Sequence, residues 1–168
     1  MQATGFLGRN KRAIKLGMNY WLMKSEPGEC SVDDALAAPE STVPWVGVRN
    51  YQAGNFMRDE MTLGGGVLFY HSSCAEPGIV GIAQVASAPY PDPTQFDPKS
   101  HYFDAKSNPA EPRWMLVDVQ VVKKTRNLTL PELRATESLT ELLVLKKGNR
   151  LSITPVTPEH WQTIMQVI

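Results

Sequence analysis

Short runs of apolar residues, broken by proline and glycine, dominate the hydrophobic pattern along this chain. A run that is apolar throughout is typical of a buried strand, whereas alternation of apolar and polar residues is typical of a strand with one exposed face. These two patterns predict strands over residues 20–23, 67–70, 79–85, 114–123 and 151–153. Gly81, inside the third segment, indicates a bulge or a close approach of another backbone segment.

The helices that the pattern predicts are few and short. They are expected between Ser31 and Pro39, between Asn50 and Asp59, and from Thr157 onward, because each begins at a residue that favours the N-cap position. Short helices placed between strands and turns predict an α+β fold with a small, strongly bent or barrel-like sheet.

Residues 87–113 follow neither the helix nor the strand period, and they hold six of the 13 prolines. Loops of this length are typically either functional or disordered. Tyr90, Phe96, Tyr102 and Phe103 lie within this one. Since disordered linkers contain few aromatic residues, we expect the 87–113 loop to pack onto the domain.

The length of 168 residues fits a single domain, and a composition of 42% apolar and 20% charged residues excludes disorder throughout. Apolar stretches fall short of the roughly 18 residues that a membrane helix needs, so no membrane partner is expected. Two cysteines, Cys30 and Cys74, suggest a reducing compartment. We therefore expect a monomeric cytoplasmic protein of the bacterial intracellular type, with association with the nucleoid as a further option.

The net charge of zero conceals an asymmetry. Residues 1–17 contain four basic residues and no acidic residue, so the remainder carries 13 basic against 17 acidic residues. We expect residues 1–17 to be a poorly ordered leader and residues 18–168 to form the domain. A body with this negative balance does not hold long nucleic acid by charge alone, so a nucleic-acid role requires a local site.

Signatures of common enzymes are missing from the sequence. The glycines at 64–66 are not followed by the Lys-Ser/Thr pair of a phosphate-binding loop, and HExxH, GxSxG and a helix-opening GxGxxG do not occur. The spacing of histidine and cysteine gives no zinc quartet, so we predict neither a metal site nor a cofactor. His71 and Cys74 remain candidates for an acid, base or nucleophile in an enzyme that acts on a nucleotide or a small amide.

Aromatic and small polar residues gather at the ends of the predicted strands and helices. Three strings contain them: YWLMKSEP at 20–27, WVGVRNYQ at 45–52 and YHSS at 70–73. Together with PGIVGIAQV at 77–85, FDPKSHYFD at 96–104, PRWMLVDVQVV at 112–122 and RLSITPV at 150–156, they resemble the EVE domain family over residues 19–168. The resemblance implies a PUA-like fold, a bent pseudo-barrel sheet with short flanking helices. It also implies kinship with YTH domains and with SRA-type readers of flipped bases.

The resemblance further implies a function. EVE domains are regarded as readers of modified bases, most often modified cytosine in DNA, with some members linked to RNA. Here Trp45 stands at the position of a cage tryptophan, and the Lys24-Ser25 pair at that of the lysine and serine that close the first strand. Asn50 matches a polar residue after the cage, and His71-Ser72 matches the strand end that faces the pocket.

We therefore predict a noncatalytic reader that binds a modified nucleobase of DNA or RNA in an aromatic-lined pocket. Such a pocket needs flat rings for stacking and fixed groups for the Watson–Crick edge of the base. Trp45 could instead belong to the core, Asn50 could serve only as a helix cap, and Trp21 is expected in the core. The candidate base-binding residues are Lys24, Ser25, Trp45, Arg49, Asn50, Tyr51, Tyr70, His71, Ser72, Tyr102 and Trp114.

Overall fold

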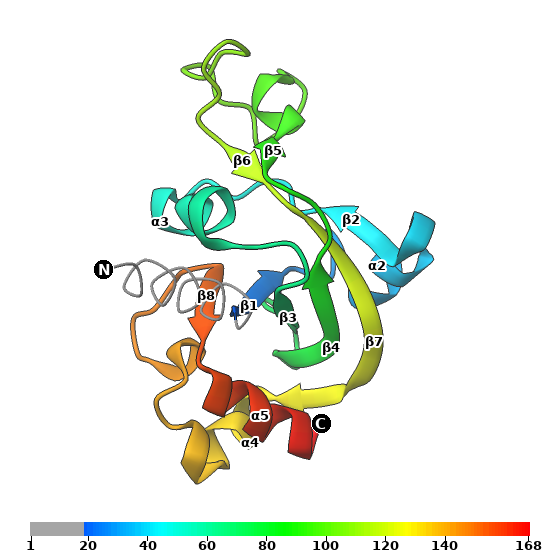
Figure 1. The fold of residues 1–168 in the computed structure, drawn as a ribbon, viewed down its shortest axis with the longest axis vertical. Coiled ribbons are helices and arrows are strands. Elements are labelled where there is room, and N and C mark those ends of the chain that lie inside the picture. The colour runs from blue at the N-terminus through cyan, green and yellow to red at the C-terminus, as the bar shows by residue number, and fades with distance from the viewer. Residues whose placement is uncertain (1–18) are drawn as a thin grey trace, which may run out of the picture.

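The computed structural model describes residues 19–168, and the predicted leader over residues 1–17 lies outside the described residues. The strands are β1 (Tyr20–Ser25), β2 (Thr42–Pro44), β3 (Gly66–His71), β4 (Gly78–Val85), β5 (Tyr90–Pro91), β6 (Met115–Leu116), β7 (Asp118–Thr129) and β8 (Ile153–Val156) (Figure 1). Six of them form a sheet in the order β2-β7-β4-β3-β1-β8, and β5 pairs with β6. β1 and β3 are parallel, and their other pairings are antiparallel.

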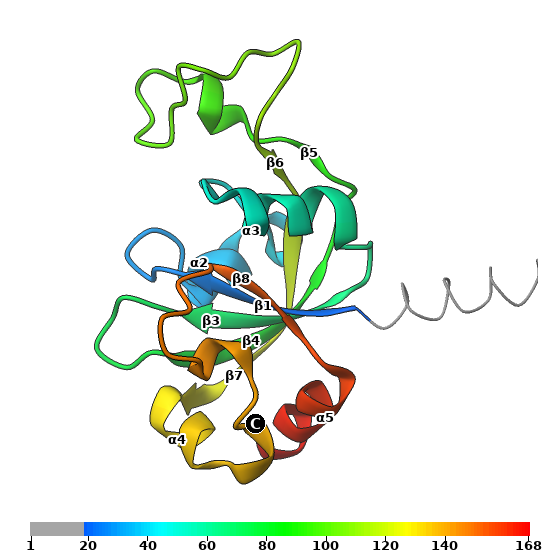
Figure 2. The ribbon, with the colours of Figure 1, turned by 90° about the vertical axis from the view of Figure 1, so that its left-hand side faces the viewer.

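Short helices flank this sheet. They are α2 (Val32–Ala37), α3 (Tyr51–Asn55) with a π-helical continuation (Phe56–Glu60), α4 (Leu130–Ala135) and α5 (Pro158–Val167). α3 lies near β5 and β6 at one end of the domain, and α4 and α5 lie at the opposite end (Figures 1 and 2). The long strand β7 curves across the domain, which confirms an α+β fold with a strongly bent sheet (Figure 1). Among the described helices, none has the length and apolar character to cross a membrane.

Side-chain caps explain where the helices begin. Ser31, Asn50 and Thr157 accept hydrogen bonds from backbone N–H groups in the first turns of α2, α3 and α5, which confirms the three predicted starts. The sequence prediction missed α4. Its capping box, formed by Thr129 and Glu132, has the spacing that announces a helix start.

The core consists of two clusters of buried apolar residues. Trp21 and Met23 of β1 belong to the first cluster, whereas Leu22 belongs to the second. Because successive side chains of a strand point to opposite faces, β1 is buried on both sides, and the same holds for β3. Trp21 is 3% exposed, which confirms that it is a core residue.

Two strand predictions need correction. The expected strand over 114–123 is divided at Val117 into β6 and β7, because the chain there leaves the small β5–β6 pair and joins the main sheet. Leu116, which a single alternating strand would place on the same face as Asp118 and Gln120, is fully buried. β8 begins at Ile153 and does not include Leu151. The predicted irregularity at Gly81 is confirmed, since the pairing of β4 with β7 shifts register beside it.

Candidate functional site

A cavity of about 570 Å³ opens where β1 and β3 end. Because these neighbouring strands are parallel, with Ser25 opposite His71, the chain leaves both at the same edge of the sheet. The loops after β1 and β3 and the segment before β8 extend to one side of the domain (Figure 2). The lining of the cavity consists of residues 24–26, 29–30, 43–49, 72–73, 101–102, 150 and 152.

Hydrogen bonds fix the floor of the cavity. Ser72 N donates to the carbonyl of Ser25 at 3.0 Å, and Lys24 N donates to the carbonyl of Ser152 at 2.8 Å. Ser25 Oγ donates to the carbonyl of Cys30 at 2.5 Å, which holds the turn after β1 in place. Within the described residues the hydroxyls of Ser72 and Ser152 have no hydrogen-bond partner, so both are available to a ligand as donor and acceptor.

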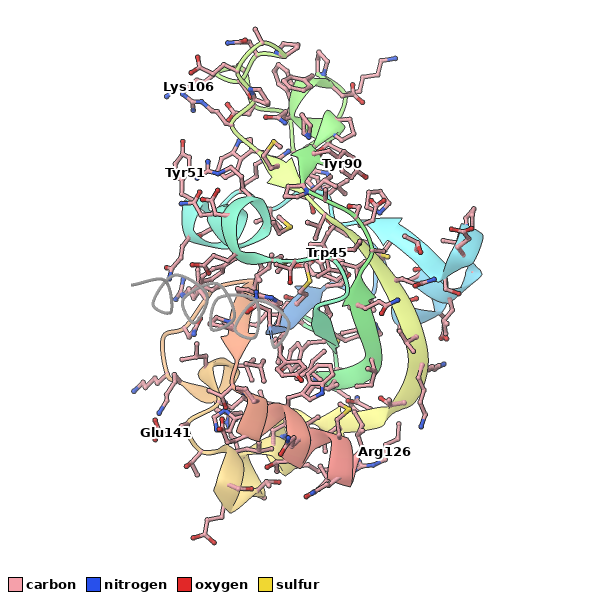
Figure 3. All side chains as sticks on the ribbon, viewed as in Figure 1. Trp45, Tyr51, Tyr90, Lys106, Arg126 and Glu141 are labelled. Carbon is pink, nitrogen blue, oxygen red and sulfur yellow. The ribbon has the colours of Figure 1, made fainter. Side chains whose placement is uncertain are left out.

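Trp45 belongs to the core as well as to the cavity lining. Its side chain is 7% exposed, and its ring meets the Phe69 ring edge-on with 5.3 Å between the centroids. Trp45 N donates to the carbonyl of Val117 at 3.1 Å, which fixes the residue beside the sheet. Figure 3 shows Trp45 in the interior of the domain. Trp45 therefore offers a small part of its surface to the cavity and is not a free-standing cage wall.

Arg49 joins the 43–49 segment to the 87–113 loop. Its guanidinium donates to Asp92 Oδ2 and to Thr94 Oγ1, each at 3.0 Å, and to the carbonyl of Tyr102 at 2.8 and 3.0 Å. The Asp92 carboxylate is 2% exposed and also accepts from Gly47 N at 2.8 Å. Although burial alone would raise the pKa of Asp92, hydrogen bonds from Thr94, Gly47 and Arg49 outweigh it and hold the pKa below its usual value. Arg49 therefore links the 43–49 segment to the 87–113 loop, and its charge is already paired with Asp92.

Tyr102 closes one side of the cavity. A Cβ atom at Gly47, whose φ is 85°, would lie 2.5 Å from Cζ of the Tyr102 ring, so the ring rests on bare backbone. Tyr102 Oη donates to Glu29 Oε2 at 2.5 Å, and His101 Nε2 lies 3.2 Å from Glu29 Oε1. Burial, followed by the hydrogen bond to Glu29, raises the pKa of Tyr102 to about 12. These contacts tie the turn after β1 to the 87–113 loop.

Two cations of the cavity lining have no ion-pair or hydrogen-bond partner for their side chains within the described residues. Lys24 is half-buried in the wall, and burial lowers the pKa of its ammonium group. Arg150 is exposed at the rim. Glu26 and Glu29 add negative charge to the same lining. The cavity therefore combines unpaired cations with polar and aromatic groups. Because acidic side chains share the lining, its electrostatic potential is not positive throughout.

The structure brings together part of the predicted site. The predicted residues that line the cavity are Lys24, Ser25, Trp45, Arg49, Ser72 and Tyr102. The predicted residues that lie outside the lining are Asn50, Tyr51, Tyr70, His71 and Trp114.

Packing and capping explain why the second group lies elsewhere. The side chain of Tyr70 is buried in the second core cluster. His71 Nε2 accepts from Val32 N at 3.1 Å, at the start of α2. Asn50 Oδ1 accepts from Ala53 N at 3.1 Å and so caps α3. Tyr51 is 60% exposed and stacks on the buried ring of Trp114, 4.9 Å between centroids.

Twelve of the 18 lining residues were not predicted from the sequence, among them Glu29, Gly47, Arg150 and Ser152. Gly47 lies inside the string at 45–52, and Arg150 and Ser152 lie inside the string at 150–156. Their position inside these strings was the signal that could have identified Gly47, Arg150 and Ser152. The contact of Gly47 with Tyr102 could not be predicted, because it joins residues far apart in sequence.

The residues of the enzyme alternative do not meet in the cavity. Cys74 lies in the connection between β3 and β4, outside the lining, and it makes no hydrogen bond to His71 among the described contacts. Burial lowers the pKa of His71, while Asp33 opposes and Lys124 assists this shift. Since Nε2 of the neutral ring already accepts from Val32 N, this imidazole serves the start of α2.

Comparison with known proteins adds relatives to this geometry. The EVE domain model matches residues 19–167. A solved protein from Pseudomonas putida is 49% identical, with a TM-score of 0.83 and coverage of 88% of this chain and 98% of the other. Human thymocyte nuclear protein 1 is 38% identical over 174 residues, which cover 94% of this chain and 77% of the human protein.

Two proteins that have been solved in complex with nucleic acid share this fold. Human thymocyte nuclear protein 1 has been solved with DNA that contains 5-methylcytosine; it is 39% identical, with a TM-score of 0.83 and coverage of 89% and 96% of the two chains. A YTH domain from Zygosaccharomyces rouxii, solved with N6-methyladenosine RNA, is 12% identical with a TM-score of 0.50 and coverage of 89% and 86%. At this identity the YTH likeness concerns the fold alone, and it supports the PUA-like architecture.

Proposed function

The chain belongs to the EVE domain family, and we propose that it is a noncatalytic reader that holds one modified nucleobase in the cavity at the ends of β1 and β3. 5-Methylcytosine in DNA is the first candidate, and a modified RNA base is the second. The observation that carries the proposal is the relative of 39% identity that binds DNA containing 5-methylcytosine. The likeness in fold to this relative extends over most of both chains, with a TM-score of 0.83.

The size of the cavity suits one base with part of its sugar. Small-molecule sites typically measure about 300–1,000 Å³, and this one measures about 570 Å³. A duplex base must be flipped out of its stack to enter such a site, at a cost of a few kcal/mol. The ring of Tyr102 and the accessible part of Trp45 offer apolar surface against which a flipped base can pack.

Polar groups on the floor can read the edge of the base. The hydroxyls of Ser72 and Ser152 are free, and the Lys24 ammonium supplies donors without an acceptor of its own in the described structure. Because Lys24 is half-buried in the cavity wall, its ammonium group is less fully hydrated than that of an exposed lysine. A carbonyl oxygen or a phosphate oxygen of the ligand would therefore gain a charge-assisted hydrogen bond from Lys24.

A binding role agrees better with the geometry than the enzyme alternative does. General acid–base or nucleophilic chemistry requires the reacting side chains within hydrogen-bond reach of one another and of the substrate. His71 and Cys74 lie outside the lining. Burial, followed by the charge of Asp34, raises the pKa of Cys30, so the thiol that does line the cavity is protonated at neutral pH.

Titration of matched oligonucleotides tests this proposal. Single-stranded and duplex DNA and single-stranded RNA, each with one cytosine or one 5-methylcytosine, are titrated against the full chain, together with RNA carrying adenine or N6-methyladenine. Burial of one methyl group contributes about 0.8 kcal/mol, so we expect a preference of about fourfold or more for one modified base. Equal affinity for every modified and unmodified pair would contradict a reader.

A matched pair of lysine variants links this binding to the cavity. A hydrogen bond to a charged group contributes about 1.5–3 kcal/mol, so Lys24→Met should weaken binding by roughly ten- to 150-fold. Lys147→Met should change little, because Lys147 is exposed and does not line the cavity. Equal losses in the two variants would mean that charge acts nonspecifically and that the cavity is not the site.

A further inference from the structure

A second aromatic feature lies beside the cavity and outside its lining. Tyr51, the first residue of α3, stacks on Trp114 with 4.9 Å between ring centroids and 22° between ring planes. Tyr51 is 60% exposed, whereas Trp114 is 6% exposed. Since one face of the tyrosine ring is covered by Trp114 and most of the residue is exposed, the opposite face of this ring is open. Figure 3 shows Tyr51 at the outer side of α3, below the loop that carries Lys106.

The ring beneath Tyr51 is held firmly. Trp114 Nε1 donates to Asp104 Oδ2 at 2.8 Å, and Trp114 N donates to Gln95 Oε1 at 3.1 Å. Gly54 of α3 packs against the same ring: a Cβ atom at this position would lie 3.6 Å from Trp114, so the helix and the indole are in contact. The exposed tyrosine therefore rests on a support that is fixed before any ligand arrives, which lowers the entropy cost of stacking.

Arg49 connects this aromatic pair to the cavity. Its Cζ atom lies 5.6 Å from the centroid of the Tyr102 ring, which lines the cavity, and 5.4 Å from the centroid of the Trp114 ring. A single guanidinium thus separates the cavity wall from the support of Tyr51. A strand that leaves the cavity past Tyr102 and Arg49 would therefore run toward the Tyr51–Trp114 pair.

Two cationic residues lie next to the Asp104 carboxylate that holds the same support. The backbone N of Lys106 donates to Asp104 Oδ1 at 3.0 Å, and Arg113 NH1 lies 3.9 Å from Asp104 Oδ2, so both residues flank the carboxylate that holds Trp114. The Lys106 side chain is exposed and has no ion-pair partner among the described residues. An aromatic face with cations at its border is the combination that binds a base and its phosphate in single-stranded nucleic acid.

We propose that Tyr51, supported by Trp114, is a stacking platform for an unpaired nucleobase adjacent to the base in the cavity. This inference rests on the proposed function, because it assumes that a nucleic-acid strand enters the cavity. The platform binds any base by its flat face, so it adds affinity without sequence preference. Lys106 and Arg113 contact the phosphate of the same nucleotide.

The test combines Tyr51 variants with a base deletion in the ligand. The probe is a fluorescent single-stranded DNA pentamer with one central 5-methylcytosine; in two further versions an abasic site replaces the neighbouring nucleotide on the 5′ or the 3′ side. Base–aromatic stacking corresponds to about five- to 150-fold in affinity, so Tyr51→Ala should weaken binding of the intact pentamer by that factor. Tyr51→Phe, which keeps the ring, should bind like the wild type.

The abasic ligands decide whether a base meets Tyr51. The wild type should bind one of the two abasic pentamers with the same reduced affinity that Tyr51→Ala shows for the intact pentamer. For this abasic pentamer, Tyr51→Ala should cause no further loss of affinity. Leu63→Ala is the control for an exposed apolar residue, since Leu63 is 72% exposed and lies outside the cavity lining. It should leave the affinity unchanged.

The outcomes separate this inference from the proposed function. Three results would overturn the platform. Tyr51→Ala could bind the intact pentamer as tightly as the wild type does, it could lower the affinity for the intact and both abasic pentamers by the same factor, or the wild type could bind no pentamer. If the Tyr51 effect and its dependence on a neighbouring base persist while cytosine and 5-methylcytosine bind equally, the platform stands and the reader function fails.

Discussion

Gly47 lies directly beneath the ring of Tyr102, so close that a Cβ atom at Gly47 would be 2.5–2.7 Å from three atoms of that ring. These two residues come from segments on either side of the cavity, one after β2 and one in the 87–113 loop. Their contact therefore sets the position of the ring that faces a ligand.

Gly47→Ala should displace Tyr102 and weaken ligand binding. Gly64→Ala is the matched control: Gly64 has φ 84° against 85° for Gly47, but nothing lies within 4 Å of its Cβ position. Both variants incur the strain of a left-handed residue, about 1–2 kcal/mol, and only Gly47→Ala adds the steric clash. Thermal unfolding and oligonucleotide affinity check this, and equal effects of the two variants on both quantities would contradict it.

Asp92→Ala should destabilise the domain far more than removal of a surface carboxylate. Loss of one partner of a buried ion pair typically costs about 3–5 kcal/mol. Because the Arg49 side chain stays 22% exposed, we expect a value near the low end, about 3 kcal/mol. Asp59→Ala, which breaks an exposed pair with Arg58, should hardly change the stability, because solvent screens an exposed ion pair. Urea unfolding of both variants gives the comparison, and similar midpoints would show that the Arg49–Asp92 clasp is dispensable.

His71 should make stability depend on pH in the mildly acidic range. Burial lowers its pKa in the folded state; the charge of Asp33 opposes this shift, and the charge of Lys124 assists it to a smaller extent. A lowered folded pKa means that the unfolded chain takes up the proton first. This stabilising contribution is therefore complete above the unfolded pKa of about 6.5 and is lost as pH falls toward the folded pKa.

His71→Gln should remove this part of the pH dependence, which cannot exceed about 1.4 kcal/mol per pH unit for one group. Denaturant unfolding between pH 7 and pH 5 measures it. His101→Gln is the control, because the His101 side chain is 72% exposed. A wild-type stability that stays flat over this range, or an unchanged slope in His71→Gln, would show that His71 does not carry the effect.

Arg150→Ala should reduce the salt dependence of nucleic-acid binding. Each phosphate neutralised on single-stranded DNA contributes about 0.7 to the log–log slope, and Arg150 is a free cation of the rim. Arg126→Ala should leave the slope unchanged, since Arg126 is already bonded to Glu132 at 2.8 Å, lies beside α5 (Figure 3) and does not line the cavity. Anisotropy titrations from about 50 to 200 mM salt measure both slopes, and a larger change for Arg126→Ala would refute this assignment.

Local sequence patterns were sufficient for most of the fold. Ser31, Asn50 and Thr157 have short polar side chains that cap a helix through contacts three residues away, so their role is visible in the sequence itself. The division at Val117 could not be predicted in this way, because it depends on which distant strands pair with the segment on either side.

The candidate site was only partly predictable for a similar reason. Lys24, Ser25 and Ser72 stand at the ends of two parallel strands, and a strand end is recognisable from the sequence. Tyr51 belongs to the string at 45–52, and its place in the sequence suggested a cavity residue. Its ring instead stacks on Trp114, which is more than sixty residues away in the chain, so a local pattern could not place it. The sequence left Trp45 as either a cage residue or a core residue, and its contact with Phe69, which is distant in sequence, places most of its surface in the core.

Chemical-shift mapping tests the central claim, that this cavity holds the modified base, most directly. The ¹⁵N-labelled full chain is titrated with 5-methyl-2′-deoxycytidine, and the backbone amide signals are followed. We expect saturable shifts at Ser25, Gly47, Ser72 and Tyr102, which line the cavity. We expect none at Gly64, Gln84 and Gln120, which line a separate hollow of about 340 Å³. Shifts confined to that hollow, or the absence of saturable shifts in the cavity for this nucleoside and for N6-methyladenosine, would show that the cavity does not hold the modified base.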